Sequence, residues 1–328
     1  MTASPRRTDG LDGLRVLVTG GSGFIGRHVV AQLTQAGARV RVLDLQPHPE
    51  QTVPITQGDL ASPEILATAL ADGIDAVVHL AAVTSVLKSV EQPEQTFITN
   101  VAATHALLGA ARKAGAHTLV FASTNAVTGP MEEPAISERA VLRPLTPYGA
   151  TKAAAEMLMS AYTAVFDLRC VCLRLTNVYG PAMQAKDSIV ARLMRATLLH
   201  TGFEVYGDGT QVRDYVHVSD VVAAVKLGLA DPAWSGPTVI GSGRSLSVLE
   251  VVEAVRAATG TSLEVTHGPA RAGEMPAVIV DTAQAHAAGW APQFSFEDGV
   301  AEVWREWSTL DPEAVAAGHG AVATGVGR

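Results

Sequence analysis

The chain has 328 residues, of which 48% are apolar and 17% charged, and its net charge is −8. This length and composition allow a large α/β domain, with or without a small second one, around a substantial core. The acidic balance argues against a nucleic-acid-binding surface, which is normally basic. No uninterrupted apolar run is long enough for a transmembrane helix, and none follows Arg6 and Arg7, so we expect neither a membrane span nor a signal peptide.

The first regular elements are two strands joined by a glycine-rich loop and a helix. Arg15–Thr19 is a β-branched run that predicts a buried strand, and Phe24–Gln35 has a helical pattern. Gly20 and Gly23 lie between them, Gly26 falls in the first turn of the helix, and a second strand ends at Asp44. This arrangement is a dinucleotide-binding fingerprint in its required setting.

The glycines of this loop remove Cβ atoms where backbone amides must approach a pyrophosphate, which then rests on the helix N-terminus. Asp44, at the end of the second strand, is placed to bind both hydroxyls of a ribose. Its carboxylate repels a 2′-phosphate, so we predict NAD rather than NADP as the cofactor.

Strand and helix patterns continue to alternate along the chain, which predicts a doubly wound parallel sheet, the Rossmann fold. The expected strands are Val53–Gln57, Asp75–Leu80, His117–Ala122 and Arg169–Leu175, and the expected helices are Pro63–Leu70, Glu94–Ala114 and Pro147–Phe166. Ligands of such sheets bind beyond the carboxyl ends of the strands. Small or polar residues stand at or just after those ends, namely Asp44, Asp59, Ala81, Thr124 and Asn177.

The pattern becomes less regular after Asn177, which predicts a smaller lobe interleaved with returns to the sheet. We expect residues 14–177 to be mainly the NAD-binding domain and residues 178–310 mainly the substrate lobe. Residues 1–13 and 311–328 are expected to be loose termini. Cys170 and Cys172 alternate within an expected strand, which favours two buried thiols and a cytoplasmic protein. The histidines form no metal-ligand pattern, so no metal is expected.

Tyr148 and Lys152 are four residues apart in the expected helix Pro147–Phe166, so their side chains share one face. A free tyrosine has a pKa of about 10. A neighbouring ammonium lowers that pKa and suits the phenol to act as a base on an alcohol. The alternative is an ordinary surface pair at the start of a helix.

Together these motifs resemble the extended short-chain dehydrogenase/reductases, the NAD-dependent epimerases and dehydratases of nucleotide sugars, and most of all the UDP-sugar 4-epimerases. The similarity extends from about Arg15 to Trp307. It includes Thr19–Gly26, Tyr148-x-x-x-Lys152, Gly58-Asp59-Leu60, His79-Leu80-Ala81-Ala82, Asn177-Val-Tyr-Gly-Pro181, Arg213-Asp-Tyr-Val-His-Val218 and Gly289-Trp290-x-Pro292.

The resemblance implies a set of cofactor and catalytic residues. NAD is expected to contact Gly20, Ser22, Gly23, Phe24, Ile25, Gly26, Asp44, Asp59, Leu60, Leu80, Ala81, Ala82, Asn100, Tyr148 and Lys152. Thr124 takes the place of the family's catalytic Ser or Thr, and Tyr148 is the base. Lys152 is expected to hold the nicotinamide ribose and to keep Tyr148 acidic.

The resemblance also implies a substrate site. Asn177 is expected to touch the diphosphate, Arg213 and Arg271 to neutralise it, and Glu274 to bind the nucleotide ribose. The remaining residues line the base and sugar pockets: Thr84, Ser85, Thr124, Asn125, Ser188, Ile189, Val205 and Tyr206. Two alternatives stay open: Arg213 forms an internal ion pair, for instance with Asp214, and Lys186 is a solvated loop residue rather than a partner of a sugar carboxylate.

The residues after Thr124 bear on which reaction follows the oxidation. Related 4,6-dehydratases have Asp-Glu there, and UDP-glucuronate decarboxylases have a Glu at the second position. This chain has Asn125 and Ala126, which cannot serve as acid and base. We therefore expect a 4-epimerase of a UDP-hexose or UDP-hexuronate, although Thr128, where relatives have Tyr, allows an unusual substrate.

The alternatives are a decarboxylase or dehydratase with substituted groups, an NADH-dependent 4-keto-sugar reductase, and a non-catalytic dinucleotide sensor. The resemblance further implies a homodimer formed by the helices near Glu94–Ala114 and Pro147–Phe166. The expected partners are thus a UDP-sugar and a second copy of the chain, with no nucleic acid and no membrane.

Overall fold

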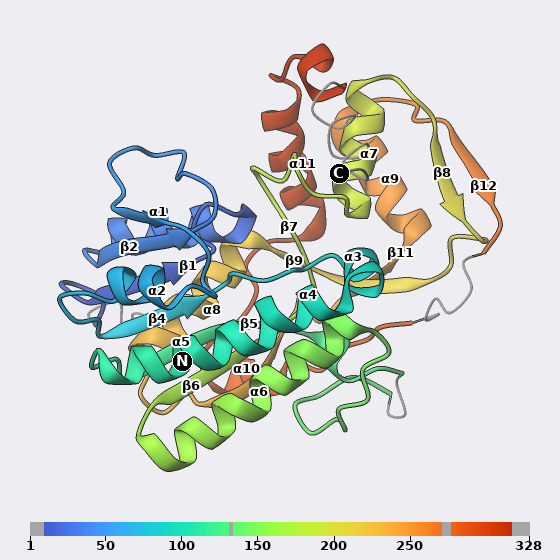
Figure 1. Cartoon of the computed structure of the whole chain (residues 1–328). Coiled ribbons are helices and arrows are strands. Elements are labelled where there is room, and N and C mark those ends of the chain that lie inside the picture. The colour runs from blue at the N-terminus through green and yellow to red at the C-terminus, as the bar shows by residue number, and fades with distance from the viewer. Residues whose placement is uncertain (1–9, 131–133, 271–276, 317–328) are drawn as a thin grey trace, which may run out of the picture. The chain divides into compact units, whose positions relative to one another are not determined.

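The computed structural model describes residues 10–130, 134–270 and 277–316. The chain forms two compact units (Figure 1). The first contains Met1–Leu175, Val221–Ile240 and Asp281–Ala291, and the second contains Thr176–Asp220, Gly241–Val280 and Pro292–Arg328. The chain therefore passes from one unit to the other several times.

The first unit is built on a seven-stranded parallel sheet with the strand order β10-β6-β5-β4-β1-β2-β3. Its strands are β1 (Arg15–Thr19), β2 (Arg39–Asp44), β3 (Ile55–Gln57), β4 (Ala76–His79), β5 (Thr118–Thr124), β6 (Arg169–Leu175) and β10 (Gly236–Ile240). The order reverses between β1 and β4, and such a reversal is where doubly wound sheets bind their ligands. The predicted fold class is confirmed.

Helices cover both faces of this sheet, as the Val-rich strands buried on both sides require. They are α1 (Phe24–Gln35), α2 (Pro63–Ala69), α3 (Val86–Glu91), α4 (Pro93–Phe97), α5 (Ala103–Lys113), α6 (Pro147–Phe166), most of α8 (Val218–Ala230) and α10 (Ala283–Ala287). One face packs on α2, α5 and α6. The other face carries Val42 and Val120, which contact the glycine loop ahead of α1 and Gly228 of α8.

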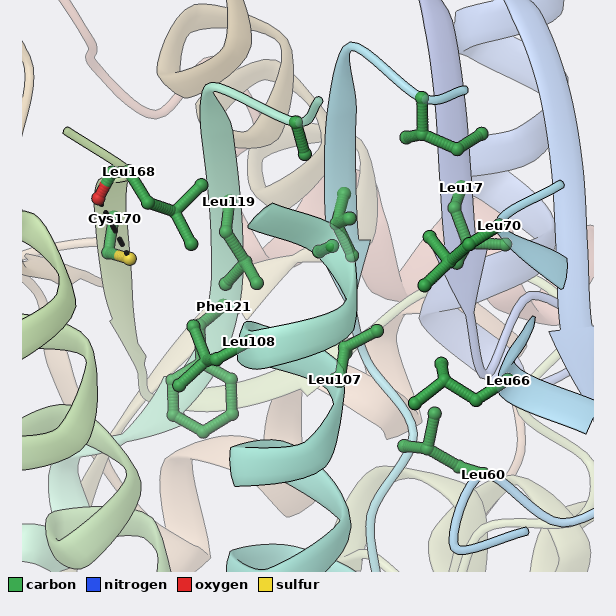
Figure 2. Close-up of a cluster of buried hydrophobic side chains, with 14 of the residues drawn as sticks. Leu17, Leu60, Leu66, Leu70, Leu107, Leu108, Leu119, Phe121, Leu168 and Cys170 are labelled. Carbon is green, nitrogen blue, oxygen red and sulfur yellow. Dashed lines mark hydrogen bonds between the residues drawn. The ribbon is translucent and has the colours of Figure 1, made fainter. Parts of the chain in front are cut away.

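The core against α2, α5 and α6 combines alternate residues of the strands with one apolar face of each helix. Figure 2 shows Leu17 of β1, Leu119 and Phe121 of β5, and Leu107 and Leu108 of α5 in this cluster. Cys170 and Cys172 of β6 belong to the same cluster and are free, buried thiols. The two cysteines thus face one side of the sheet, as their spacing predicted.

The expected continuous helix Glu94–Ala114 contains an irregular segment. α4 and α5 are joined by a π-helical turn, Ile98–Ala102, which places Asn100 at its centre. A π turn inserts an extra residue into the helical ladder and is frequent at functional sites. The prediction of one regular helix is therefore wrong over these five residues.

Where the structure describes it, the second unit holds two small sheets and three longer helices. The sheets are β11 (Ser245–Ser247), β9 (Val212–His217) and β7 (Asn177–Tyr179), in that order, and the pair β12 (Val265–Gly268) and β8 (Phe203–Tyr206). The helices are α7 (Ile189–Leu198), α9 (Val248–Thr259) and α11 (Phe296–Trp307). Across the described ranges of the chain, no helix combines the length and apolarity needed to cross a membrane.

Candidate active site

The glycine loop lies at the carboxyl end of β1, against the residues that follow β4. Gly20 has a φ of +72°, and a Cβ atom there would lie 2.6 Å from the backbone nitrogen of Ala81. A Cβ on Gly26 would collide with the carbonyl oxygen of Gly20. The loop thus leaves no room for a side chain at Gly20 or Gly26, and this close backbone packing is what a dinucleotide cradle requires.

Among the described residues, no side chain caps the N-terminus of α1 in a hydrogen bond. Gly23 occupies the N-cap position with extended dihedral angles. Phe24 and Ile25 follow in the first turn and are half-buried. The first amides of a helix attract anions, so this loop and helix fit the pyrophosphate of the predicted cofactor.

Asp44 ends β2 and turns its carboxylate toward the glycine loop. The backbone N–H of Ser22 donates to Asp44 Oδ2 at 2.9 Å, and that of Gln46 donates to Oδ1 at 2.9 Å. The Ser22 hydroxyl donates to the Gln46 carbonyl at 3.0 Å. The predicted acid and the predicted loop are therefore joined directly, with Ser22 as the link.

The other predicted cofactor residues lie after β3 and β4. Asp59 is exposed and accepts a hydrogen bond from the Ala61 N–H at 2.9 Å, whereas the Leu60 side chain is buried in the core. Leu80, Ala81 and Ala82 are half-buried. Leu60 can therefore offer the cofactor little more than its backbone.

Asn100 has a different local role from the one predicted for it. Its side chain is 2% exposed. The amide accepts from the N–H of Val83 at 2.8 Å and donates to the Val83 carbonyl at 3.0 Å and to the Thr151 hydroxyl at 3.1 Å. Asn100 thus ties the loop after β4 to helix α6, and direct cofactor contact remains a prediction.

Thr124, Tyr148 and Lys152 come together from β5 and α6. Thr146 caps α6 by accepting from the Gly149 N–H at 3.1 Å, and Pro147 occupies its first turn. These two residues start the helix directly before the tyrosine. Thr124 is the last residue of β5, and its hydroxyl hydrogen-bonds to the Tyr148 phenol.

Lys152 is 2% exposed, and its side chain reaches the end of strand β5. Its ammonium donates to the Ala122 carbonyl at 2.8 Å and sits 4.4 Å from the centre of the Phe121 ring. Burial lowers the pKa of Lys152 to about 7, and the nearby carboxylate of Glu156 opposes that change.

The pKa of Tyr148 corrects one sequence prediction. Burial raises this pKa above its usual value, and the hydrogen bond with Thr124 lowers it by a smaller amount. The predicted lowering of the Tyr148 pKa by Lys152 is therefore wrong in this structure, where the ammonium is held at the Ala122 carbonyl.

The loop after Thr124 is also ordered. Asn125–Val127 forms a short 3₁₀ turn, and the Thr124 hydroxyl accepts from the Ala126 N–H at 3.2 Å. The Thr128 hydroxyl donates to the Asn125 carbonyl at 2.9 Å. Thr84 and Ser85, predicted to line the sugar pocket, are exposed, and Ser85 caps α3 by accepting from the Lys88 N–H at 3.2 Å.

The remaining predicted substrate residues belong to the second unit. Asn177 is exposed and donates to the Asp214 carbonyl at 2.9 Å. The side chain of Val205 is buried, while Tyr206 is half-buried beside Arg192. Ser188 and Ile189 stand at the start of α7. Arg271 and Glu274 lie outside the described residues.

The surroundings of Arg213 and Lys186 bear on two alternatives raised by the sequence: an ion pair between Arg213 and Asp214, and a solvated Lys186. Arg213 and Asp214 are adjacent on β9 and so point to opposite faces. The buried Asp214 carboxylate accepts from the hydroxyls of Thr176 at 2.7 Å and Ser242 at 2.9 Å. Lys186 is half-buried, and burial lowers its pKa. A solvated loop lysine is therefore the wrong description of Lys186.

The sequence prediction missed residues that support the catalytic trio. The buried Ser89 hydroxyl accepts from the Tyr148 N–H at 3.1 Å. Glu156 lies one helical turn beyond Lys152, where an i,i+4 search along α6 would have found it. No sequence motif marked Ser89, because its contact with Tyr148 joins residues 59 positions apart.

The fold and these residues define a class of protein, the Rossmann enzymes with a Thr–Tyr–Lys trio beside a dinucleotide cradle. Within that class, the chain belongs to the NAD dependent epimerase/dehydratase family, whose model matches residues 16–240. The family membership and the NAD cofactor agree with the sequence predictions.

Several proteins of known structure or activity are similar to this chain. UDP-glucose 4-epimerase of Azospirillum brasilense is 34% identical over 319 residues, which cover 89% of this chain and 91% of that protein. The UDP-glucose 4-epimerase of Thermus thermophilus, solved with NAD, is 35% identical with a TM-score of 0.85 and covers 91% of this chain and 100% of its own. MoeE5, solved with UDP-glucuronic acid and NAD, is 38% identical with a TM-score of 0.83. The match covers 90% of this chain and 98% of the MoeE5 chain.

Proposed function

We propose that this chain is an NAD-dependent 4-epimerase of a UDP-hexose or UDP-hexuronate, acting through a transient 4-keto sugar. The observation that carries the proposal is the assembly of Thr124, Tyr148 and Lys152 at one sheet edge, followed by the unreactive pair Asn125 and Ala126. The trio supplies the proton transfers of alcohol oxidation and ketone reduction, and NAD would supply the hydride transfer. The UDP-sugars named for the similar proteins support the choice of substrate.

In the proposed reaction Tyr148 takes the proton of the C4 hydroxyl. The Thr124 hydroxyl, hydrogen-bonded to the phenol, orients the phenol of Tyr148 and the C4 hydroxyl of the sugar. NAD, when bound, supplies the hydride acceptor and donor. Because burial raises the pKa of Tyr148, the phenolate needs a nearby positive charge. In this structure the Lys152 ammonium is held at the Ala122 carbonyl, and in the proposed reaction it stabilises the phenolate from its place one turn along α6.

The second half of the reaction requires only that the ketone present its other face. Tyr148 then returns the proton to the new C4 alkoxide. Elimination of water or loss of carbon dioxide needs further proton transfer at C5 or C6. The side chains of Asn125 and Ala126 have no ionisable proton, which favours epimerisation over dehydratase and decarboxylase activity.

We further propose that Arg213, Arg271 and Asn177 bind the diphosphate, Glu274 the ribose, and Val205 and Tyr206 the base. Thr84, Ser85, Asn125, Ser188 and Ile189 line the sugar pocket in this proposal. A guanidinium fork suits a phosphate, and it supplies the positive charge that this acidic chain needs to attract an anionic substrate.

The proposed assembly is a homodimer formed by α4, α5 and α6. Apolar side chains on these helices and on the π turn between α4 and α5 are exposed: Phe97, Ile98, Met157, Val165 and Phe166. Exposed apolar patches commonly mark protein–protein contacts. Sedimentation should give a dimer mass for the wild type and for Leu249→Asp on α9, and a monomer mass for Met157→Asp. A monomeric wild type contradicts this assembly.

We place the protein in the cytoplasm. The support is chemical, since Cys170 and Cys172 are free thiols on one face of β6, and unpaired cysteines are typical of reducing compartments.

The deciding experiment is incubation with NAD⁺ and a panel of UDP-hexoses and UDP-hexuronates in D₂O, followed by NMR. A 4-epimerase gives the C4 epimer with protium retained at C4, because the hydrogen travels as hydride. UDP-glucuronate converted with carbon dioxide release, or a stable 4-keto product, contradicts the epimerase proposal. Stoichiometric consumption of NADH with a 4-keto sugar indicates the reductase instead.

A further inference from the structure

A buried charged pair lies next to the catalytic trio on the same unit. Glu156 of α6 and Arg174 of β6 are 7% and 3% exposed. Arg174 Nη2 donates to Glu156 Oε2 at 2.8 Å, and Arg174 Nε lies 3.1 Å from Oε1. The guanidinium of Arg174 therefore binds both carboxylate oxygens of Glu156 in a bidentate ion pair. The Ser123 hydroxyl donates a further hydrogen bond to Oε1.

This pair joins elements that carry the catalytic residues. Ser123 directly precedes Thr124 at the end of β5, and Glu156 lies one turn after Lys152 on α6. Arg174 also donates to the carbonyl of Glu138 at 3.1 Å. Glu138 in turn accepts from the Val239 N–H of β10 at 2.8 Å. The network thus links β5, α6, β6 and β10.

A purely stabilising role does not account for such a pair. Desolvating two charges costs as much as their attraction returns, and apolar replacements are often neutral or stabilising. What this pair does provide is a fixed geometry between the end of β5 and the helix that carries the lysine.

We propose that Glu156 is a positioning residue for the catalytic trio: through Ser123 it fixes the strand end that carries Thr124, and through its charge it keeps the Lys152 ammonium protonated at the Ala122 carbonyl. This inference rests on the proposed epimerase function for its kinetic consequence. The effect of Glu156 on the protonation of Lys152 can be measured in the protein without substrate.

The surroundings of Lys152 make Glu156 its main counter-charge. From β4 it faces His79, whose pKa burial lowers to about 3, so this ring is neutral at physiological pH. From β6 it faces Cys172, whose pKa burial raises well above the usual value, so the thiol is also neutral. The Phe121 ring on β5 carries no charge, and Arg174 of β6 is paired with the Glu156 carboxylate and offsets part of its charge. On its own helix the lysine has Tyr148 one turn before it, neutral at pH 7 because burial raises its pKa, and Glu156 one turn after it, whose carboxylate opposes the loss of the lysine proton.

The test is a direct titration of Lys152. The chain has five lysines, at positions 88, 113, 152, 186 and 226. In the full-length protein labelled with ¹³C at lysine Cε, the signal absent from Lys152→Met identifies Lys152. We expect Glu156→Gln to lower its titration midpoint by about one pH unit, the size of a partly compensated charge at this separation.

The matched control is Glu250→Gln, which removes a carboxylate from the N-terminal turn of α9 in the other unit. It changes the net charge equally and should leave the Lys152 midpoint unchanged. Glu156→Asp, which keeps the charge, should hold the midpoint close to that of the wild type. If Glu156→Gln does not fold, Ser123→Ala, which removes only the hydrogen bond to Glu156, still tests the positioning role through kcat.

The kinetic consequence is measured on the proposed UDP-sugar substrate. In Glu156→Gln the basic limb of the kcat profile should move to lower pH by the same amount, with KM changed less than twofold. Ser123→Ala should reduce kcat about tenfold and leave the lysine titration unchanged. If Glu156→Gln lowers only the melting temperature, and the titration and pH profile match the wild type, Glu156 is merely structural. If no UDP-sugar turns over in the wild type, the proposed function fails while the titration still tests the charge.

Discussion

Two parts of the same sheet edge are built by opposite means. At the β1–β2 part, the structure removes side chains, so that Gly20 lies against Ala81 and Gly26 against Gly20. At the β5–β6 part, it buries charge, with Lys152 and Arg174 only 2% and 3% exposed. The first part is therefore specified by shape and the second by electrostatics. Added atoms should damage the first, and changes of charge or pH should affect the second.

The largest effect is expected at the electrostatic part, from Tyr148→Phe. Loss of the phenol removes the proposed base, and general bases contribute roughly 10²–10⁴-fold to rate. We expect kcat for UDP-sugar epimerisation to fall about 10³-fold, while NAD recovered from the purified protein stays at the wild-type level. Tyr162→Phe, on the same helix, is the control and should retain full activity. Turnover of Tyr148→Phe near the wild-type rate would refute the mechanism.

The shape-specified part is tested by one methyl group. In Gly26→Ala the new Cβ meets the Gly20 carbonyl, whereas in Gly109→Ala on α5 the nearest atom, the Tyr162 hydroxyl, is 3.6 Å away. We expect Gly26→Ala to weaken NAD binding at least about 100-fold, measured by calorimetry, and to lower the melting temperature. Gly109→Ala should keep NAD affinity and gain up to about 1 kcal/mol from helix propensity. Equal NAD affinities in the two variants would show that the cradle tolerates a Cβ.

The sequence predicted the shape-specified part better than the electrostatic one. The glycine spacing and Asp44 are local motifs whose geometry follows from the strand, loop and helix around them. The alternation of strands and helices was likewise enough for the sheet. The helix bearing Tyr148 and Lys152 was predicted at its observed bounds, Pro147–Phe166, because its cap and its apolar face lie within one segment.

What the sequence did not predict depends on contacts between distant segments. The π turn places Asn100, whose side chain hydrogen-bonds to Val83 and Thr151, 17 and 51 positions away. The site of the Lys152 ammonium depends on the Ala122 carbonyl, 30 positions before it. Burial then sets the pKa values of Tyr148 and Lys152, and burial follows from packing that no motif encodes.

A smaller effect is expected on stability, from Lys152→Met. Well below pH 7 Lys152 is charged in both the folded and the unfolded chain, so the folded chain bears the full cost of burying the ammonium. Between the folded pKa of about 7 and the unfolded value of 10.5, the unfolded chain keeps a proton that the folded chain has lost, and wild-type stability rises with pH. Lys152→Met should therefore be more stable by about 2 kcal/mol at pH 6 and lose that advantage by pH 10. Denaturant unfolding across this range is the measurement, and a pH-independent difference would contradict it.

The smallest effect concerns His79, a neutral group at the end of β4, the strand next to β5. Its ring hydrogen-bonds to the hydroxyls of Thr19 at 2.7 Å and Thr104 at 2.8 Å, and burial lowers its pKa from 6.5 to about 3. As the pH falls from 6.5 toward 3, the unfolded chain takes up a proton that the folded chain refuses, so wild-type stability declines. His79→Gln keeps a neutral hydrogen-bonding side chain but does not titrate. Between pH 6 and pH 5 the free energy of unfolding, measured with urea, should fall by about 1 kcal/mol less in this variant than in the wild type. This holds whatever the stability of the variant at pH 7, because only a titrating group makes stability depend on pH. An unchanged slope would mean that the ring takes up a proton in the folded chain, and β4 would then carry charge beside Lys152.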